Sequence, residues 1–210
     1  SAAIDGIEGA LVQIEAISLN SLPQILMTGL PGEVVKESRE RVRACLVNLG
    51  FDVPSAKILV HLSPANVKKS GSHYDLAVAL AVLSSESKLL NVPLHECGFL
   101  GEVSLDGSLR PVSCALPLID VMVQEAEIKT VIIPKGNEAE GVLINSNKIR
   151  VAECVGDVIR FLRGQGELPY CQNVSSEIKM REDRIFDQIQ GQEHAKRALQ
   201  IALAGRHHML

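Results

Sequence analysis

The stretch 57–84 constrains the fold more than any other part of the sequence, because a short apolar segment, a polar loop and an apolar helix follow one another there. Residues 57–62, KILVHL, are predicted as a buried strand that Ser63-Pro64 ends. Residues 74–84, YDLAVALAVLS, are predicted as an apolar helix. Short strands that alternate with helices in this way favour an α/β or α+β fold.

The rest of the chain continues this alternation. Only 3% of residues are aromatic and there is no Trp, so the core must be built from aliphatic side chains. A helix opens at Pro31-Gly32 and ends at Gly50, and a hairpin over 97–109 turns at Asp106-Gly107. Further strands are predicted at 9–19, 24–28, 128–133 and 148–152, and further helices at 115–125, 137–143 and 155–162.

Composition excludes several classes of protein. The net charge of −4 and the pI of about 5.9 mean that nucleic-acid binding would need a local basic patch. Five widely spaced cysteines without a C-x-x-C pair argue against zinc and favour reduced, packed thiols. No apolar run reaches the ~18 residues of a membrane span, and no signal peptide precedes the first strand. We expect a soluble cytoplasmic protein without membrane contact, and the first residue, Ser1, indicates a trimmed or engineered start.

The last 47 residues differ in character from the part before them. Residues 164–184 are rich in Gly, Pro, Ser and charged side chains and are predicted as a linker. Residues 192–204 are predicted as a helix with an apolar stripe, and 206–210 as the beginning of a buried strand.

The loop KKSGSHYD is the richest polar cluster of the chain. It precedes a helix, whose free N–H groups attract anions. Phosphate binding is one interpretation, hydrolysis by Ser72 with His73 or Asp75 is another, and a capped loop with solvated lysines is the third. The sequence has neither a P-loop nor a G-x-S-x-G elbow. The candidate anion or DNA contacts are Lys68, Lys69, Ser70, Ser72 and His73.

Two other patterns are interpreted as structural. Gly29-Leu30-Pro31-Gly32 is predicted as a turn, because Glu33 follows it and would repel an anion at the helix start. The six histidines form no ligand set, and adjacent side chains such as His207 and His208 point to opposite faces of a strand. We therefore expect no metal site.

Three stretches together carry a family resemblance. They are MTGLPGEVVKESRERVRACLVNLGF, KILVHLSPANVKKSGSHYDLAVALAVL and GFLGEVSLDGSLRPVSCALPLI. In this order they resemble the N-terminal domain of the magnesium-chelatase-like AAA+ family, the bacterial group called YifB or ComM. The tail DQIQGQEHAKRALQIALAGRHHML resembles the opening of the ATPase module of that family.

The resemblance implies a fold and a division of the chain. Residues 7–163 are expected to form a domain similar to the Lon protease proteolytic domain and to the second domain of ribosomal protein S5. A linker would occupy 164–184, and 185–210 would begin the AAA+ module without its Walker A loop. Nucleotide-proximal residues in the whole protein would be Gly191, Gln192, His207 and His208.

In Lon-like proteases a serine acts together with a lysine on a later helix. In this sequence the place of the nucleophile falls near His73, and that of the lysine falls within 115–117. Residues 111–127 contain no Lys, so the resemblance implies a protease-like fold without protease chemistry.

The resemblance also implies cofactors and partners. The 210 residues are expected neither to bind nor to hydrolyse ATP, whereas the whole protein would use ATP and Mg²⁺. Its partners would be its own AAA+ module, neighbouring subunits of a homo-oligomeric, hexameric ring, and DNA. The expected activity is that of a branch-migration helicase in natural transformation, with DNA contacts by Lys68, Lys69, Arg39, Arg41 and Arg43. A Ser-based Lon-like hydrolase and a magnesium-chelatase-type metal-insertion motor remain as alternatives.

Overall fold

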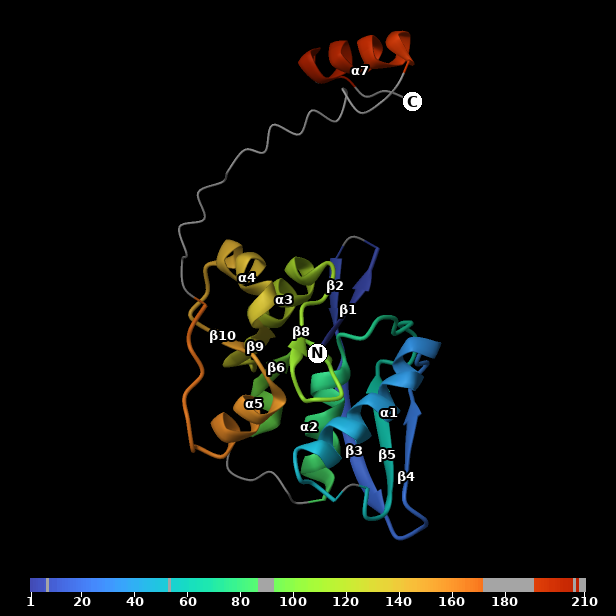
Figure 1. Ribbon diagram of the computed structural model, residues 1–210, viewed down its shortest axis with the longest axis vertical. Helices are drawn as coiled ribbons and strands as arrows, with labels where there is room; N and C mark the ends of the chain where they lie inside the picture. The colour runs from blue at the N-terminus through green and yellow to red at the C-terminus, as the bar shows by residue number, and fades with distance from the viewer. Residues whose placement is uncertain (7, 53, 87–92, 172–190, 206, 208–210) are drawn as a thin grey trace. The chain divides into compact units, whose positions relative to one another are not determined.

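The computed structural model describes residues 1–6, 8–52, 54–86, 93–171, 191–205 and 207. The chain divides into two compact units, Ser1–Val174 and Ser175–Leu210, which are described separately. The first unit combines helices with sheets that contain parallel strands, so the predicted α/β class is confirmed (Figure 1).

A three-stranded sheet forms one part of the first unit. Its strands are β3 (Gln13–Leu19), β5 (Lys57–Ser63) and β4 (Gln24–Thr28), in the order β3–β5–β4. β5 is antiparallel to β3 and parallel to β4, and the helix α1 (Glu33–Asn48) makes the crossover that a parallel pair requires. Alternation along β5 buries every second side chain, namely Ile58, Val60 and Leu62.

The predicted strand over 9–19 is two strands in the structure. β2 (Glu8–Leu11) pairs with β1 (Ala2–Asp5), whereas β3 pairs with β5. The chain changes partner at Val12, whose amide and carbonyl both bond to the backbone of Ser1. The alternation of side chains continues through the change of partner, which is why the sequence pattern indicated a single strand.

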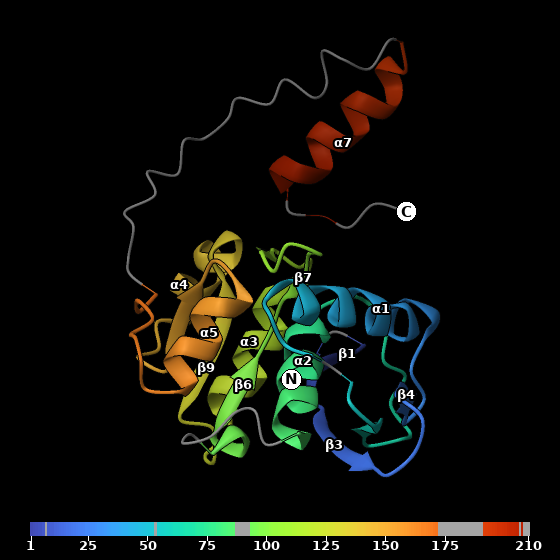
Figure 2. The ribbon, with the colours of Figure 1, turned by 60° about the horizontal axis from the view of Figure 1, so that its bottom comes forward.

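The helix α2 (Asp75–Ser85) lies between the two larger sheets (Figures 1 and 2). Side chains on every side of this helix are buried, and they include Leu76, Val78, Leu80 and Leu83. A helix that is apolar all round is typical of the interior of a domain. The apolar helix predicted at 74–84 is therefore confirmed.

The second sheet is parallel throughout. Its strands are β10 (Ile149–Ala152), β9 (Thr130–Pro134) and β6 (Cys97–Phe99), in the order β10–β9–β6. Helices cover both faces, as parallel sheets require. Along β9, Val131 and Ile133 belong to one hydrophobic core cluster, and Ile132 belongs to the other.

Three helices alternate with the strands of this sheet along the chain, α3 (Ala115–Gln124) after β6, α4 (Glu138–Ile144) after β9 and α5 (Val155–Leu162) after β10. α3 packs with Val131 and Ile133, whereas α5 packs on the side of Ile132 together with α2. The chain also forms the short 3₁₀ helices η1 (Leu94–Glu96) and η2 (Lys135–Asn137). These elements agree with the predicted helices to within a few residues.

The prediction of one hairpin over 97–109 is wrong in its first half. Residues 97–99 form β6, which pairs in parallel with β9. The hairpin is shorter and consists of β7 (Glu102–Val103) and β8 (Leu109–Arg110). Its predicted turn at Asp106-Gly107 is confirmed, since Gly107 has a φ of 87° and the Asp106 carboxylate accepts a bond from the Ser108 amide at 3.0 Å.

Residues 168–171 lie along the outer edge of β10. The Val151 amide donates to Pro169 O at 2.9 Å, and the Cys171 amide donates to Ile149 O at 3.1 Å. The Arg150 guanidinium lies 3.9 Å from the Tyr170 ring centroid. The first part of the predicted linker therefore packs on the first unit, and its remainder, 172–184, lies outside the described residues. The domain limits 7–163, 164–184 and 185–210 stay a prediction.

All five cysteines are free thiols: Cys45, Cys97, Cys114, Cys154 and Cys171. In the second unit α7 (Glu193–Gly205) has no buried residue, and Ile201 and Leu203 are exposed. The strand predicted at 206–210 lies outside the described residues apart from His207. Within the described part of the chain, no helix is long and apolar enough to cross a bilayer.

Candidate functional site

The loop that joins β5 to α2 carries the residues predicted to contact an anion. The structure separates them by exposure. Lys68 and Ser70 are exposed, Ser72 is half-buried, and Lys69 and His73 are buried. The five side chains therefore do not form one open binding surface.

Lys69 is an internal cation. Its side chain is fully buried, and Nζ donates to Gly29 O at 3.0 Å and also to Pro64 O. Burial lowers the pKa of this ammonium group, and the two carbonyl oxygens take the place of water around it. The predicted contact of Lys69 with phosphate is wrong, because the side chain already binds its own fold. The lysine joins the end of β4 to the end of β5.

The Gly29–Gly32 segment is the partner of this lysine, and it is a structural turn as predicted. Gly29 has a φ of 94°, and a Cβ there would lie 1.9 Å from Leu62 O. The Gly32 amide donates to Lys69 O at 2.8 Å. Glycine is required at position 29 because the backbone approaches the neighbouring strand closely.

His73 faces the interior. Its Nε2 lies 3.0 Å from Ala2 O, and its ring centroid lies 4.0 Å from that of Tyr74. Because a carbonyl oxygen only accepts, Nε2 carries the proton. Burial lowers the pKa of His73 to about 4, so the imidazole is neutral at physiological pH. The His73 ring is thus hydrogen-bonded to the backbone of β1, whereas the Ser72 hydroxyl is hydrogen-bonded to Glu102.

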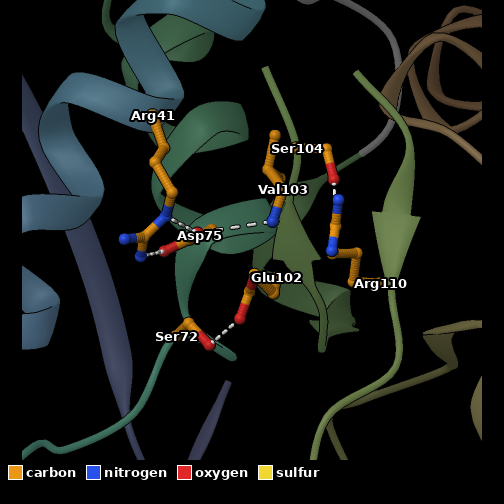
Figure 3. A network of polar contacts seen from close by, with 7 residues as sticks. All are labelled: Arg41, Ser72, Asp75, Glu102, Val103, Ser104 and Arg110. Atoms are coloured by element: carbon orange, nitrogen blue, oxygen red, sulfur yellow. Dashed lines mark hydrogen bonds and ion pairs between the residues drawn. The ribbon is translucent and has the colours of Figure 1, made fainter. Parts of the chain in front are cut away.

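Ser72 bonds to an acid. Its hydroxyl donates to Glu102 on β7, and neither His73 nor Asp75 is its partner (Figure 3). A carboxylate is a much weaker base than an imidazole or a neutral amine, so it activates a hydroxyl poorly. The predicted pairing of Ser72 with His73 or Asp75 is therefore not formed.

Asp75 is the centre of a network that the sequence analysis did not identify. Its carboxylate is fully buried and accepts two bonds from Arg41, at 2.9 and 3.1 Å, and one from the Val103 amide at 3.3 Å (Figure 3). Burial raises the pKa of Asp75, and the Arg41 guanidinium opposes that rise. The network joins α1, α2 and β7. The signal in the sequence was an acid at the start of an otherwise apolar helix.

Arg41 is therefore not available to DNA in the way that the sequence analysis expected. Its guanidinium is held in a bidentate pair with Asp75, and its side chain is only 26% exposed. On the same helix Arg39 lies 3.3 Å from Glu40, and Arg43 is exposed. Two basic residues of α1 are thus paired with acids of the same helix, Lys36 with Glu33 and Arg39 with Glu40.

The place implied for a catalytic lysine is the start of α3. Ala115 is buried there, Leu116 is exposed, and Cys114 precedes them with a φ of 54°. The lysine of the loop itself, Lys69, has its Nζ on the carbonyls of Gly29 and Pro64. No hydrogen bond in the described part of the chain joins an amine to Ser72.

The predicted nucleotide-proximal residues belong to the second unit. Gly191 and Gln192 both have positive φ values, 71° and 60°, and the Gln192 carbonyl accepts the first helical bond of α7 from Lys196 at 2.9 Å. His207 is exposed, and its amide donates to Ala202 O at 2.8 Å. His208 lies outside the described residues. Gly191 and Gln192 thus have the geometry of a helix start, and a nucleotide role for these residues stays a prediction.

Comparison with known proteins identifies the relatives of this chain. Residues 14–137 match the family of the ChlI subunit of Mg-chelatase, and residues 185–210 match the family model of magnesium chelatase, subunit ChlI. Competence protein ComM of Haemophilus influenzae is 36% identical over 98% of this chain and 41% of its own length. The YifB protein of Escherichia coli is 34% identical over 98% of this chain and 40% of its own.

Lon proteases are also similar. The archaeal Lon protease of Thermococcus kodakarensis is 32% identical over 63% of this chain and 21% of its own length. This similarity supports the predicted Lon-like fold of the first unit. The chain spans about two fifths of the length of the ComM and YifB proteins that it matches.

Proposed function

This chain belongs to the magnesium chelatase ChlI family, with ComM and YifB as relatives, and from this premise we propose that it supplies a non-catalytic front domain to an ATP-dependent motor. The absence of a catalytic role is inferred from the hydrogen bonds that the side chains of the β5–α2 loop make. Lys69, Ser72 and His73 each bond to a group of the fold. The residues that would have to act on a substrate instead hold the domain together.

The longer protein, in this proposal, is a homo-oligomeric ring that moves DNA branches with ATP and Mg²⁺. The resemblance to the YifB/ComM group and the competence-protein name of the Haemophilus relative support it. The 210 residues do not fit a triphosphate by themselves, because their sequence has no G-x-x-x-x-G-K-[ST] loop. No step of ATP hydrolysis is therefore assigned to them.

DNA contact by the first unit is proposed for the exposed part of the loop. Lys68 and Ser70 remain free to reach a phosphate, whereas Lys69 is committed to carbonyl oxygens. One lysine neutralises one phosphate, so Lys68→Ala in the full-length protein should reduce the slope of log K against log salt by about 1. Lys129→Ala is the matched control, since that exposed lysine pairs with Glu96 at 2.6 Å. An equal change in both variants contradicts a specific contact by Lys68.

The motor and the alternatives separate in one set of assays. We expect ATP hydrolysis by the full-length protein to rise when a four-way DNA junction is added. Stimulation by a tetrapyrrole and not by DNA would favour a metal-insertion motor. Labelling of Ser72 by an activated serine-directed probe, lost in Ser72→Ala, would favour the hydrolase.

A further inference from the structure

A groove of about 660 Å³ runs beside β3 over the face of α2. Its floor is apolar, with Ile14 and Ala16 from β3 and Ala77, Leu80 and Ala81 from α2. Cys97 and Phe99 of β6 line the groove as well. It contains none of the residues assigned above to the loop between β5 and α2, apart from Pro64 at its border.

Two sheet edges border this groove. Among the described strands, β3 is the outer strand of its sheet and pairs only with β5, and β6 is the outer strand of the other sheet and pairs only with β9. An outer strand presents unpaired N–H and C=O groups, which are a template for a further strand. Polar backbone therefore borders an apolar floor, as in sites that bind an extended peptide by strand addition.

The backbone already shows how a strand pairs at this edge. The Ser1 amino group donates to Val12 O at 3.0 Å, and the Val12 amide donates to Ser1 O at 2.9 Å. This reciprocal pair continues the antiparallel register of β1 with β2. In such a register every second residue faces the partner strand, so the amides of Ile14 and Ala16 face the groove.

The rim selects a sign of charge. Glu15, Glu125 and Glu127 line the groove, and His95 is the only basic side chain among the described lining residues. An acidic rim above an apolar floor favours a strand with apolar residues facing down and basic residues between them.

We propose that this groove is a strand-acceptor site. It binds an extended polypeptide segment that continues β1 in the amino-terminal direction and pairs antiparallel with β3. The segment has apolar side chains toward α2 and basic side chains toward the glutamates. This strand fills the space between the edges of β3 and β6.

The test extends the 210-residue chain by six residues before Ser1. The second and fourth residues before Ser1 are valines, which face the floor, and the others are lysines. In the matched control, prolines replace both valines and remove the N–H groups that pair with Ile14 and Ala16. We expect hydrogen exchange of the Ile14 and Ala16 amides to slow at least ~10-fold in the valine variant only, as their opening requires the new strand to leave.

Three results overturn the proposal. They are unchanged exchange in the valine variant, equal protection in the proline variant, and loss of the folded circular dichroism spectrum on extension. The free valine peptide, added in micromolar amounts to the unextended chain, tests the continuity with β1. Full protection by the free peptide contradicts that continuity, and weak or absent protection supports it.

Discussion

Replacing Arg41 with alanine should destabilise the first unit strongly, and more so at neutral than at acidic pH. Arg41 is the guanidinium that faces the fully buried carboxylate of Asp75. Removing one partner of a buried ion pair costs about 3–5 kcal/mol, because the other charge stays in the interior. The side chain of Arg41 is 26% exposed, so water can partly replace it, and we expect a loss of about 3 kcal/mol at pH 8.

The pH dependence follows from the pKa of Asp75. Burial already raises this pKa, and without Arg41 it rises further. The folded state then binds more protons than the unfolded state above the ordinary carboxyl pKa, so the stability of the variant falls as pH rises. The deficit relative to the wild type should therefore shrink toward pH 4, where the buried carboxyl is protonated.

Urea unfolding of wild type and Arg41→Ala at pH 4.5 and pH 8 measures both effects. Asp75→Asn is the matched variant, because the amide oxygen can still accept from the Val103 amide while Arg41 reaches solvent. We expect it to lose only about 1–2 kcal/mol, with little dependence on pH. A loss below ~1 kcal/mol in Arg41→Ala, or an equal loss at both pH values, refutes this account of the network.

Three further predictions concern the same loop and its neighbours. Gly29→Ala should lower the free energy of unfolding by ~4 kcal/mol or more, because a Cβ there would lie 1.9 Å from Leu62 O. Gly50→Ala is the control, since Gly50 has a φ of 83° and a Cβ there would meet nothing within 4 Å; denaturant unfolding should show a loss of only about 1–2 kcal/mol. Lys69→Met should lose about 2–3 kcal/mol, because it removes both hydrogen bonds that this buried side chain donates to the carbonyls of Gly29 and Pro64. Lys68→Ala should stay within ~0.5 kcal/mol, and equal losses would contradict the internal role of Lys69. Burial lowers the pKa of His73 to about 4, so His73 binds fewer protons in the folded than in the unfolded state. When the pH falls from 6.5 to 4, the free energy of unfolding of the wild type should therefore fall by ~3 kcal/mol more than that of His73→Gln. Parallel pH profiles of the two proteins would contradict this.

Elements with a clear period were predictable from the sequence. The apolar run of α2, the stripe of α1 and the Asp106-Gly107 turn each matched a local rule. The change of partner at Val12 was not predictable, because alternation continues through it and only the pairing differs. β6 was assigned to the hairpin because its true partner, β9, is distant in sequence: Cys97 pairs with Thr130.

In the candidate site, too, the residue types of the loop could be interpreted from the sequence, but their tertiary contacts could not. Lysines, serines and a histidine in one loop indicated a surface for anions, but burial is decided by which segments pack on the loop. The Gly29–Gly32 turn covers Lys69, and the backbone of β1 bonds His73. The Arg41–Asp75 pair joins residues 34 positions apart, which no spacing rule connects. The absence of a lysine in 111–127 was readable directly from the sequence.

We propose that a protease-like fold serves a DNA motor without catalysing a reaction of its own. The most direct measurement is ATP-driven branch migration of a four-way DNA junction by the full-length protein, with wild type and Ser72→Ala compared at equal concentration. We expect ATP-dependent movement at the same rate in both proteins, since the Ser72 hydroxyl donates its hydrogen bond to Glu102. Absence of ATP-dependent movement in the wild type, or its loss in a folded and assembled Ser72→Ala protein, would contradict the account.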